Sequence, residues 1–412
     1  MRHICLPLRF LILFIVLAGI FTLSGVAAYS IHKDVTIENT RESIKLLDRE
    51  GLHPVAGLSE LSMRDNYTDA LMLGMAVSGT DSMPLCDAMG NPYYIDSVNN
   101  TDTRIAAAKV MRYDTASLIK SSYATYWHGY MLPLRVSSIC FDLKGIRILS
   151  AVTLGVLFFI AVILVYRRRP VAESIAFILT ALTLTPWVVA TSLQFASVFF
   201  VLLIALISLL SADKTFRKPE NLYLAFFTIG AFTSFLDLLT APLLTLGIPL
   251  AAYLYSIKLN RKKRITLLAI ISWGAGYALL WASKWALASW LSPFNVISDA
   301  GASIAFRTAG ALPDYITTGF IIKSAISIIA LLAIILSILL IIRKRNPKEF
   351  RSSEWLLIIA ALPLVWYAVL YNHTIIHYWF AWRSAGVSIF CLILFVCAVY
   401  KNREKHISSK HP

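Results

Sequence analysis

The chain has 412 residues, of which 58% are hydrophobic and only 15% are charged, whereas about 25% of residues are charged in a typical soluble domain. Because a soluble domain of about 300 residues buries only roughly 75% of its unfolded surface, this composition excludes a soluble enzyme, a disordered chain and a fibrous protein. The net charge of +15 lies in clusters beside apolar segments, so it indicates membrane topology and not binding to nucleic acid.

The apolar segments predict an all-α, polytopic membrane helix bundle of about ten spans, because one span needs about 20 apolar residues. The predicted spans are 9–29, 147–166, 172–189, 192–211, 221–239, 241–257, 265–287, 317–342, 355–371 and 383–400. They divide the chain into an N-terminal membrane anchor (1–29), a large extracytoplasmic loop of short helices (30–146), a membrane bundle of about nine spans (147–400) and a basic cytoplasmic tail (401–412).

Basic clusters set the expected orientation of these spans. Such clusters follow the second span at Arg167–Arg169, the sixth at Arg261–Arg264 and the eighth at Arg343–Arg345. With ten spans and both termini in the cytoplasm, all of them fall on the cytoplasmic side of the plasma membrane, as the positive-inside rule requires. The first span is interpreted as a retained anchor and not as a cleaved signal peptide, because its apolar run of about 20 residues exceeds the usual 7–15.

The extracytoplasmic loop is expected to fold as short helices and not as strands. Helical spacing or composition marks residues 36–50, 65–79 and 103–113, and Asp65 is a good N-cap for the second of these helices. Residues 117–135 are aromatic and amphipathic, so they are expected to lie on the outer leaflet of the membrane.

The same loop contains two cysteines, Cys86 and Cys140. An oxidising compartment permits a disulfide between them, but the sequence leaves this pairing and two free thiols both open. No cysteine spacing typical of a metal site occurs in the chain.

Two acids of the loop are candidates for general-base chemistry. Asp65 and Asp69 are four residues apart, so on a helix both carboxylates face the same way. Two neighbouring acids beside an apolar pocket can shift each other's pKa and act as a base. The simpler interpretation is that Asp65 is only a helix cap and Asp69 a solvated side chain, and the spacing alone favours it.

Two further ionisable residues lie at the outer ends of predicted spans. Asp237 sits at the turn between the fifth and sixth spans, where it is either a helix-end acid that reaches water or a ligand or base. Lys284, near the outer end of the seventh span, either extends its ammonium group to the membrane surface or binds a lipid phosphate.

The densest polar cluster lies between the last two spans, in the segment NHTIIHYWFAWR at 372–383. His373 and His377 are one helical turn apart, a spacing that can bind a metal but is a weak signal without acidic support. Arg383 is an arginine on the outer side of a chain that keeps most of its arginines inside. This mixture suits a site for a phosphate and an aromatic-stacked sugar, and the alternative is an ordinary interfacial belt of aromatic residues.

The layout of one span, a large outer loop and a bundle with short outer hairpins resembles the GT-C superfamily of integral-membrane glycosyltransferases. Four stretches resemble uncharacterised bacterial membrane proteins of that kind: DNYTDALML at 65–73, YWHGY at 126–130, FLDLLTAPL at 235–243, and residues 372–383. The resemblance implies that a sugar passes from a polyprenyl-phosphate donor to a cell-envelope glycan or glycolipid acceptor on the outer face of a bacterial plasma membrane. It also implies that an acid of the first outer loop, Asp65 or Asp69, is the base or the ligand of a Mg²⁺ or Mn²⁺ ion.

The remaining candidates have substrate-binding roles in this hypothesis. Arg383, Lys284 or a protonated histidine would stabilise the phosphate leaving group, and aromatic side chains would stack on sugar faces. The expected substrate-binding residues are Tyr126, Trp127, His128, Tyr130, Asp237, Lys284, His373, His377 and Arg383. Two alternatives are a transporter or flippase of lipid-linked substrates and a non-catalytic membrane assembly protein. Because no strong charge is predicted near the bilayer centre, the transporter is less favoured.

Overall fold

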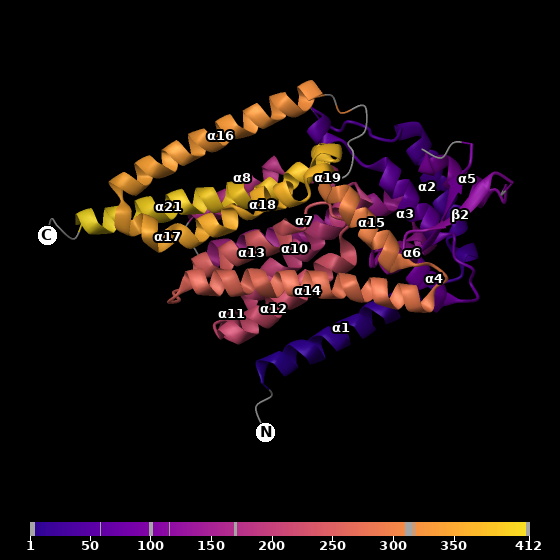
Figure 1. Ribbon diagram of the computed structural model, residues 1–412, viewed down its shortest axis with the longest axis horizontal. Helices are drawn as coiled ribbons and strands as arrows, with labels where there is room; N and C mark the ends of the chain where they lie inside the picture. The colour runs from indigo at the N-terminus through magenta and orange to yellow at the C-terminus, as the bar shows by residue number, and fades with distance from the viewer. Residues whose placement is uncertain are drawn as a thin grey trace.

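The computed structural model describes residues 5–57, 59–98, 102–114, 116–168, 171–309, 316 and 318–408. Long helices lie side by side, and a compact region of short elements covers one end of them (Figure 1). We call this region, residues 30–142, the cap. Figure 1 places the start of α14 (Lys262–Leu291) and the end of α16 (Thr318–Arg345) at the opposite end, which we call the basic end.

Helical segments lie at each of the ten places where spans are predicted. The other helices outside the cap are α1 (Leu6–Tyr29), α7 (Leu143–Arg168), α8 (Val171–Thr183), α9 (Pro186–Val189), α10 (Leu193–Ser211), α11 (Asp213–Phe216), α12 (Pro219–Leu236), α13 (Leu243–Ser256), α15 (Val296–Ala309), α17 (Pro347–Ala360), α18 (Leu362–Val369), α19 (Tyr371–Ile376), α20 (Tyr378–Ala381), η3 (Trp382–Ala385) and α21 (Gly386–Ser408). Six stretches in the described part of the chain are long and apolar enough to cross a membrane: α1, α7, α10, α14, Pro347–Val369 and Tyr378–Tyr400. The chain is therefore a multi-pass helical membrane protein, and the count of ten spans stays a prediction.

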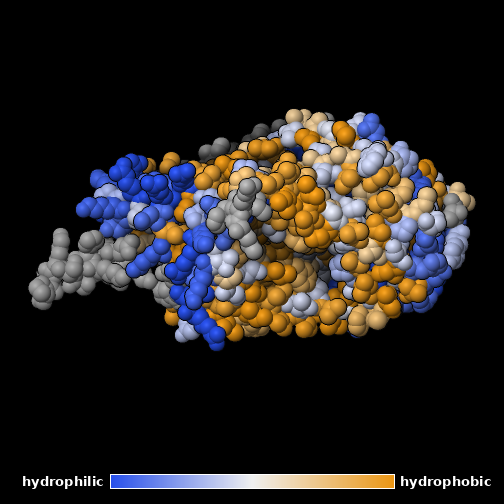
Figure 2. Space-filling view, turned by 90° about the horizontal axis from the view of Figure 1, so that it is seen from below, coloured by the Kyte–Doolittle hydropathy of each residue, from blue (hydrophilic) through white to orange (hydrophobic). Residues whose placement is uncertain are grey.

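The surface agrees with insertion in a membrane. On the face that Figure 2 shows, an apolar belt covers the middle of the molecule, with polar side chains gathered at the basic end and a mixed surface over the cap. Large apolar side chains project from the belt, for example Leu23, which is 68% exposed, and Phe159, which is 67% exposed. In water these residues would be unfavourable, but in a bilayer they face lipid chains.

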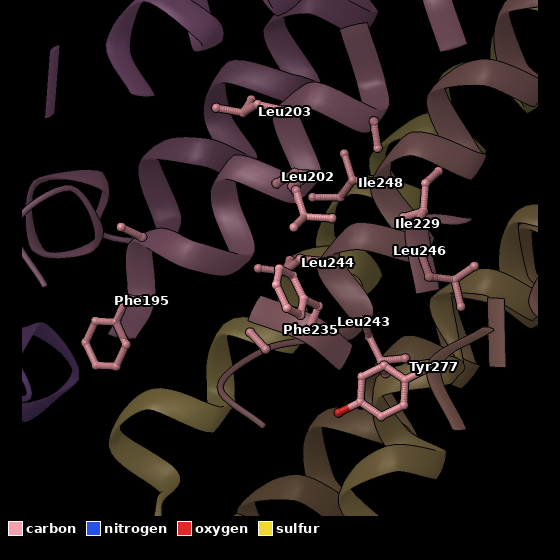
Figure 3. Close-up of a cluster of buried hydrophobic side chains, with 14 of the residues drawn as sticks. Phe195, Leu202, Leu203, Ile229, Phe235, Leu243, Leu244, Leu246, Ile248 and Tyr277 are labelled. Carbon is pink, nitrogen blue, oxygen red and sulfur yellow. The ribbon is translucent and has the colours of Figure 1, made fainter. Parts of the chain in front are cut away.

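The core of the bundle lies between α10, α12, α13 and α14, and Figure 3 shows side chains from all four helices converging there. Two glycines allow α12 and α14 to pack backbone against backbone. A Cβ atom on Gly230 would lie 2.0 Å from the carbonyl oxygen of Trp273, and one on Gly276 would lie 2.0 Å from that of Phe227. Small residues commonly permit this close approach between membrane helices.

The cap contains five α-helices, two single-turn 3₁₀ helices and one hairpin in its described part. These elements are η1 (Lys33–Val35), α2 (Ile37–Glu50), η2 (Glu60–Ser62), α3 (Asn66–Ala76), α4 (Pro84–Gly90), β1 (Pro92–Asp96), α5 (Thr103–Met111), β2 (Leu118–Ser122) and α6 (Met131–Cys140). The predicted helices at 36–50, 65–79 and 103–113 are confirmed by α2, α3 and α5. Asp65 is the N-cap of α3, as predicted.

The prediction that the cap has no strands is wrong. β1 and β2 pair antiparallel, with Tyr94 opposite Lys120. β1 (PYYID) is rich in the aromatic and β-branched residues that favour strands, and β2 lies within residues 117–135, which the sequence predicts to form an amphipathic interfacial segment. The residues from 124 to 131 are largely buried within the protein instead of lying on its lipid-facing surface, because they pack on α14 and α12. Cys86 and Cys140 are both free thiols.

Candidate functional site

Asp69 joins the cap to the membrane bundle. Its Oδ1 accepts hydrogen bonds from the backbone amides of Leu193 at 3.0 Å and Gln194 at 3.4 Å, and from the hydroxyl of Ser192 at 3.3 Å. A carboxylate at the first amides of a helix is stabilising because those amides have no partner inside the helix and the helix dipole is positive there. Asp69, although it comes from α3, therefore caps the N-terminus of α10.

The other Asp69 oxygen faces a buried arginine. Oδ2 lies 3.5 Å from Nη2 of Arg147, which also binds Asn66 at 2.9 Å and the carboxylate of Glu50 at 2.8 Å. Burial raises the pKa of Asp69 to about 6, although the charge of Arg147 opposes the shift. These contacts connect α2, α3, α7 and α10, and they favour a structural role for Asp69.

Asp65 caps the N-terminus of its own helix, α3. Its Oδ1 accepts from the amide of Thr68 at 3.0 Å and its Oδ2 from the Thr68 hydroxyl at 2.7 Å. The side chain is only 3% exposed, and burial raises its pKa to about 6, against the effect of the two Thr68 hydrogen bonds. Both oxygens are thus engaged, and Asp65 also acts electrostatically on Tyr123.

The segment from Tyr126 to Tyr130 is fixed by contacts with the bundle. Trp127 donates from Nε1 to the carbonyl of Leu280 at 2.6 Å, and the amide of Gly129 donates to the carbonyl of Phe235 at 2.8 Å. A Cβ atom at Gly129 would lie 2.4 Å from the Phe235 ring, so only glycine fits there. These contacts hold the segment between the cap and the bundle.

His128 is a buried structural residue in this segment. Its φ of +53° is in the left-handed region, its Nδ1 lies 2.7 Å from the Tyr130 hydroxyl, and its Nε2 lies 2.7 Å from the carbonyl oxygen of Tyr123. Burial lowers its pKa to about 3, so the ring is neutral at pH 7. The side chains of His128 and Tyr130 are therefore both engaged in contacts within the protein.

Lys284 terminates a cap helix. Its ammonium group donates to the carbonyls of Ala88 at 2.8 Å and Met89 at 2.9 Å, and to the side-chain oxygen of Asn91 at 2.9 Å. The last carbonyls of α4 have no partner inside that helix, and a cation at a helix C-terminus is favourable. All three ammonium protons are used, so this geometry favours a structural role over phosphate binding.

Arg383 is fully buried without an acidic partner among the described residues. Its Nη2 donates to the hydroxyl of Thr185 at 2.9 Å, whereas Nε and Nη1 have no hydrogen-bond partner. The guanidinium carbon lies 4.5 Å from the ring centroid of Phe195 and 5.4 Å from that of Trp382. An uncompensated buried cation is costly, so this side chain is a second candidate for binding an anion.

The best site candidate gathers around Arg307, which lies on α15. Its guanidinium carbon is 5.6 Å from the ring centroid of Tyr126, and Arg307 makes no ion pair or hydrogen bond to any residue of the chain that the structure describes. Burial raises the pKa of Tyr126 far above its ordinary value, and the charges of Arg307 and Asp237 both act on this ring. Arg307 and Asp237 therefore approach Tyr126 from two different elements.

Asp237 lies in the turn between α12 and α13 and is 2% exposed. Its Oδ1 accepts from the amide of Thr240 at 3.0 Å, and the Thr240 hydroxyl and the amides of Leu238 and Ala241 also stabilise the carboxylate, although no donor meets hydrogen-bond geometry at the buried Oδ2. A buried carboxylate oxygen without a partner is unusual, and such groups occur at functional sites. Asp237 thus offers an acceptor for a ligand proton.

Two histidines complete the cluster. His373 Nε2 lies 3.1 Å from the carbonyl oxygen of Leu239, and the His373 and His377 rings are 4.8 Å apart. Burial lowers the pKa of His373 to about 4 and that of His377 to about 3, and the positive charge of Arg307 adds to both shifts. Both rings are therefore neutral at pH 7. No group of three His, Cys, Asp or Glu side chains that could hold a metal ion lies together in the described part of the chain.

We call Arg307, Tyr126, Asp237, His373 and His377 the Arg307 cluster. Four of its five members are candidates from the sequence, and the structure brings the five together from four separate parts of the chain. Asp69, Lys284, Trp127, His128 and Tyr130 are instead engaged in contacts that hold the cap on the bundle. Arg307 was missed as a site residue, although an outer-side arginine was the signal that selected Arg383.

Two apolar grooves run along the membrane side of the bundle. One, of about 360 Å³, lies below the cap and is lined by residues of α6, α7 and α10, including Tyr130 and Leu193. The other, of about 920 Å³, continues towards the basic end between α1, α10 and α12. The two share Phe200, Ile204 and Leu236, so they form one apolar track that suits a lipid chain.

Comparison with known proteins gives no relative. No protein-family model, no curated protein and no solved structure matches this chain.

Proposed function

We propose that this protein is a membrane glycosyltransferase of the GT-C type, which moves a sugar from a polyprenyl-phosphate donor to a cell-envelope glycan or glycolipid. The observation that carries the proposal is the Arg307 cluster. In this cluster a cation without an acidic partner contacts an aromatic ring that also senses the charge of a buried carboxylate, at the cap end of a membrane bundle. In this proposal the cap lies outside a bacterial plasma membrane and both termini lie in the cytoplasm.

The chemistry needs a base and an anion-binding group. Asp237 would take the proton from the acceptor hydroxyl while its oxygen forms the new bond to the anomeric carbon. The bond between that carbon and the phosphate oxygen breaks, and the electron pair leaves with the polyprenyl phosphate. Arg307 would stabilise the negative charge of the leaving phosphate, and the buried ring of Tyr126 would position its guanidinium group.

The choice of base differs from the one implied by the resemblance. Asp69 uses Oδ1 to cap α10, and although its Oδ2 also has no hydrogen-bond partner, this oxygen faces the guanidinium group of Arg147 at 3.5 Å, which favours a paired charge over a base. Asp65 binds Thr68 with both oxygens. Asp237 has an oxygen with neither a hydrogen-bond partner nor an ion pair among the described residues, so we assign the base to Asp237. The described residues contain no group of three metal-ligating side chains, and the proposed step uses only residues of the chain.

The lipid part of the donor would lie in the apolar track. The track is lined by α1, α6, α7, α10 and α12 and opens to the lipid-facing surface of the bundle. A polyprenyl chain is apolar along its whole length, so it remains in contact with apolar surface when it moves from the bilayer into the track. The same track would also serve a flippase of lipid-linked substrates, but the charged groups of the Arg307 cluster all lie at one end of the bundle and not along a path across it.

Deletion of the gene in the source organism tests the function. We expect one sugar to disappear from the envelope glycans or glycolipids in mass spectra and to return when the wild-type gene is restored. Accumulation of the sugar-loaded polyprenyl phosphate in the deletion strain would be the second expected sign. An unchanged sugar content would contradict the transferase and favour the flippase or assembly alternatives.

A further inference from the structure

An open pocket lies at the basic end of the molecule, far from the Arg307 cluster. Its volume is about 890 Å³, and its walls come from the linker between α13 and α14, the first turn of α14, and α17. The lining residues are Tyr255, Ile257, Lys258, Leu259, Asn260, Arg261, Lys262, Lys263, Arg351, Ser352, Ser353, Trp355, Leu356 and Ala398. The pocket therefore joins two parts of the chain that are about 90 residues apart.

Five of the lining residues are cationic and none is acidic. Lys263 pairs with Glu354, which lies next to the pocket. Lys258, Arg261 and Arg351 make no ion pair or hydrogen bond with any described residue. The pocket thus carries a surplus of at least three positive charges that the described part of the protein does not neutralise.

The position of these charges on α14 is unfavourable without a ligand. The four cations Arg261 to Arg264 occupy the N-terminal end of α14, where the helix dipole is already positive. The first turn contains no acid, and no side chain caps the helix start. Arg261 also adopts a φ of +59°, a left-handed conformation that is uncommon for arginine. An anion at this place would relieve the charge repulsion and accept from the free amides of the first turn.

The remaining lining shows what kind of anion fits. Ile257, Leu259 and Leu356 give the pocket an apolar side, and Figure 2 shows the polar basic end directly beside the apolar belt. A ligand with an anionic head and an apolar tail matches both surfaces. Basic pockets between membrane helices are known to hold the head groups of anionic lipids.

We infer that this pocket binds the head group of an anionic membrane phospholipid. The phosphate lies at the start of α14 between Lys258, Arg261 and Arg351, and the acyl chains pass from the apolar side of the pocket into the adjoining leaflet. The inference does not depend on the proposed glycosyltransferase function, because the pocket and the Arg307 cluster lie at opposite ends of the molecule.

The positive-inside rule alone also accounts for cations at this end, so the test must separate a pocket from a charged surface. Lys258→Gln/Arg351→Gln removes two charges from the pocket. Lys344→Gln/Arg345→Gln removes two exposed charges from α16 at the same end, outside the pocket lining. Thermal unfolding of each detergent-solubilised variant shows whether it is folded, and Lys258→Gln alone replaces the double variant if that one does not fold.

Native mass spectrometry with added phosphatidylglycerol, cardiolipin or phosphatidylcholine measures the binding. We expect wild type to retain the two anionic lipids and not phosphatidylcholine. At roughly 1 kcal/mol for each basic residue, the pocket variant should bind them about thirtyfold more weakly, and the α16 variant should match wild type. Equal weakening in both double variants, or retention of phosphatidylcholine to the same extent, would overturn the inference. Saturable binding of inorganic pyrophosphate without retention of either anionic lipid would also overturn the inference, because the ligand would then be a soluble anion.

Discussion

The guanidinium carbon of Arg307 lies 5.6 Å from the centre of the Tyr126 ring, and no described carboxylate pairs with this arginine. The same ring is reached by the negative charge of Asp237 from the turn after α12. A cation and an acid thus both act on one aromatic side chain. The guanidinium group of Arg307 has no described ion-pair partner, and one carboxylate oxygen of Asp237 has no hydrogen-bond partner. The buried Asp237 oxygen is costly to leave without a partner, whereas the half-buried Arg307 is accessible to an anion, and this relationship makes the Arg307 cluster the centre of the proposed activity.

Replacement of Arg307 tests the anion-binding half of the site. We expect Arg307→Gln to lower the amount of transferred sugar in cells at least tenfold, because the phosphate leaving group loses its positive partner. Arg307→Lys should retain part of the activity, since it keeps the charge but not the planar geometry of the guanidinium group. Mass spectrometry of envelope glycans measures both effects.

The matched control is Arg112→Gln, which changes an exposed arginine of the cap. This variant should behave as wild type in the same glycan measurement. Unfolding temperatures of the Arg307 variants should also equal that of wild type, because Arg307 makes no ion pair or hydrogen bond to described residues. Full transfer in Arg307→Gln would remove this residue from the mechanism.

Asp69 should matter for stability and not for chemistry. Asp69→Ala removes the cap of α10 and is expected to lower the free energy of unfolding by about 1–2 kcal/mol. Asp69→Asn should cost less, because an amide oxygen still accepts from the amide of Leu193. Thermal unfolding in detergent measures the relative stabilities of these variants, and Asp114→Asn, which changes an exposed residue, is the control. Normal stability with complete loss of sugar transfer would instead identify Asp69 as the base.

The contact between α12 and α14 gives a sharp packing prediction. Gly276→Ala places a methyl group 2.0 Å from the carbonyl oxygen of Phe227, so the helices must separate. We expect a loss of about 1–3 kcal/mol, as for other overpacked cores. Gly274→Ala, two residues away on the same helix, has nothing within 4 Å of the added Cβ and should have almost no effect. Equal unfolding temperatures for the two variants would contradict this packing.

The raised pKa of Asp65 predicts a pH effect on stability. The unfolded carboxyl releases its proton near pH 3.8 and the folded one near pH 6, so the folded state binds more protons between these values. The free energy of unfolding contributed by this group therefore falls as pH rises through that window. Asp65→Asn keeps a good N-cap and removes the titrating group. The unfolding temperature of the variant minus that of wild type should therefore increase from pH 4 to pH 6.5.

The comparison with wild type at each pH is needed because other groups titrate in the same range. Asp69 shifts in the same direction as Asp65, whereas the lowered pKa values of His373 and His377 make stability rise with pH. The difference between variant and wild type isolates Asp65. A constant difference across the whole pH range would show that the folded carboxyl has an ordinary pKa.

Local features of the fold were predictable from the sequence. The N-cap at Asp65, the amphipathic helix α2 and the apolar helices of the bundle depend on neighbours in the sequence, and the pattern shows them directly. The hairpin of β1 and β2 was not predicted, because each strand has only five residues and the two are separated by a helix. A short aromatic segment has no period long enough to distinguish strand from helix.

The roles of the charged residues were harder to predict, because their partners are distant in the chain. Asp69 caps a helix whose first residue is Leu193, and Lys284 binds Asn91 across nearly two hundred residues. Sequence spacing identified these residues as unusual but gave no partner, so a helix cap and a substrate-binding residue looked alike. Asp237 was identified correctly as an acid at a helix end, and only the structure shows that one of its oxygens has no hydrogen-bond partner.

The most direct test of the account is complementation of the deletion strain with Asp237→Asn, beside wild type and the exposed-site control Asp114→Asn. Mass spectrometry of envelope glycans and glycolipids, at matched protein levels in the membrane, gives the result. We predict that wild type and Asp114→Asn restore the missing sugar and that Asp237→Asn does not, although it folds and reaches the membrane. Full restoration of the sugar by Asp237→Asn would contradict the assignment of the base and, with it, the Arg307 cluster as the catalytic site.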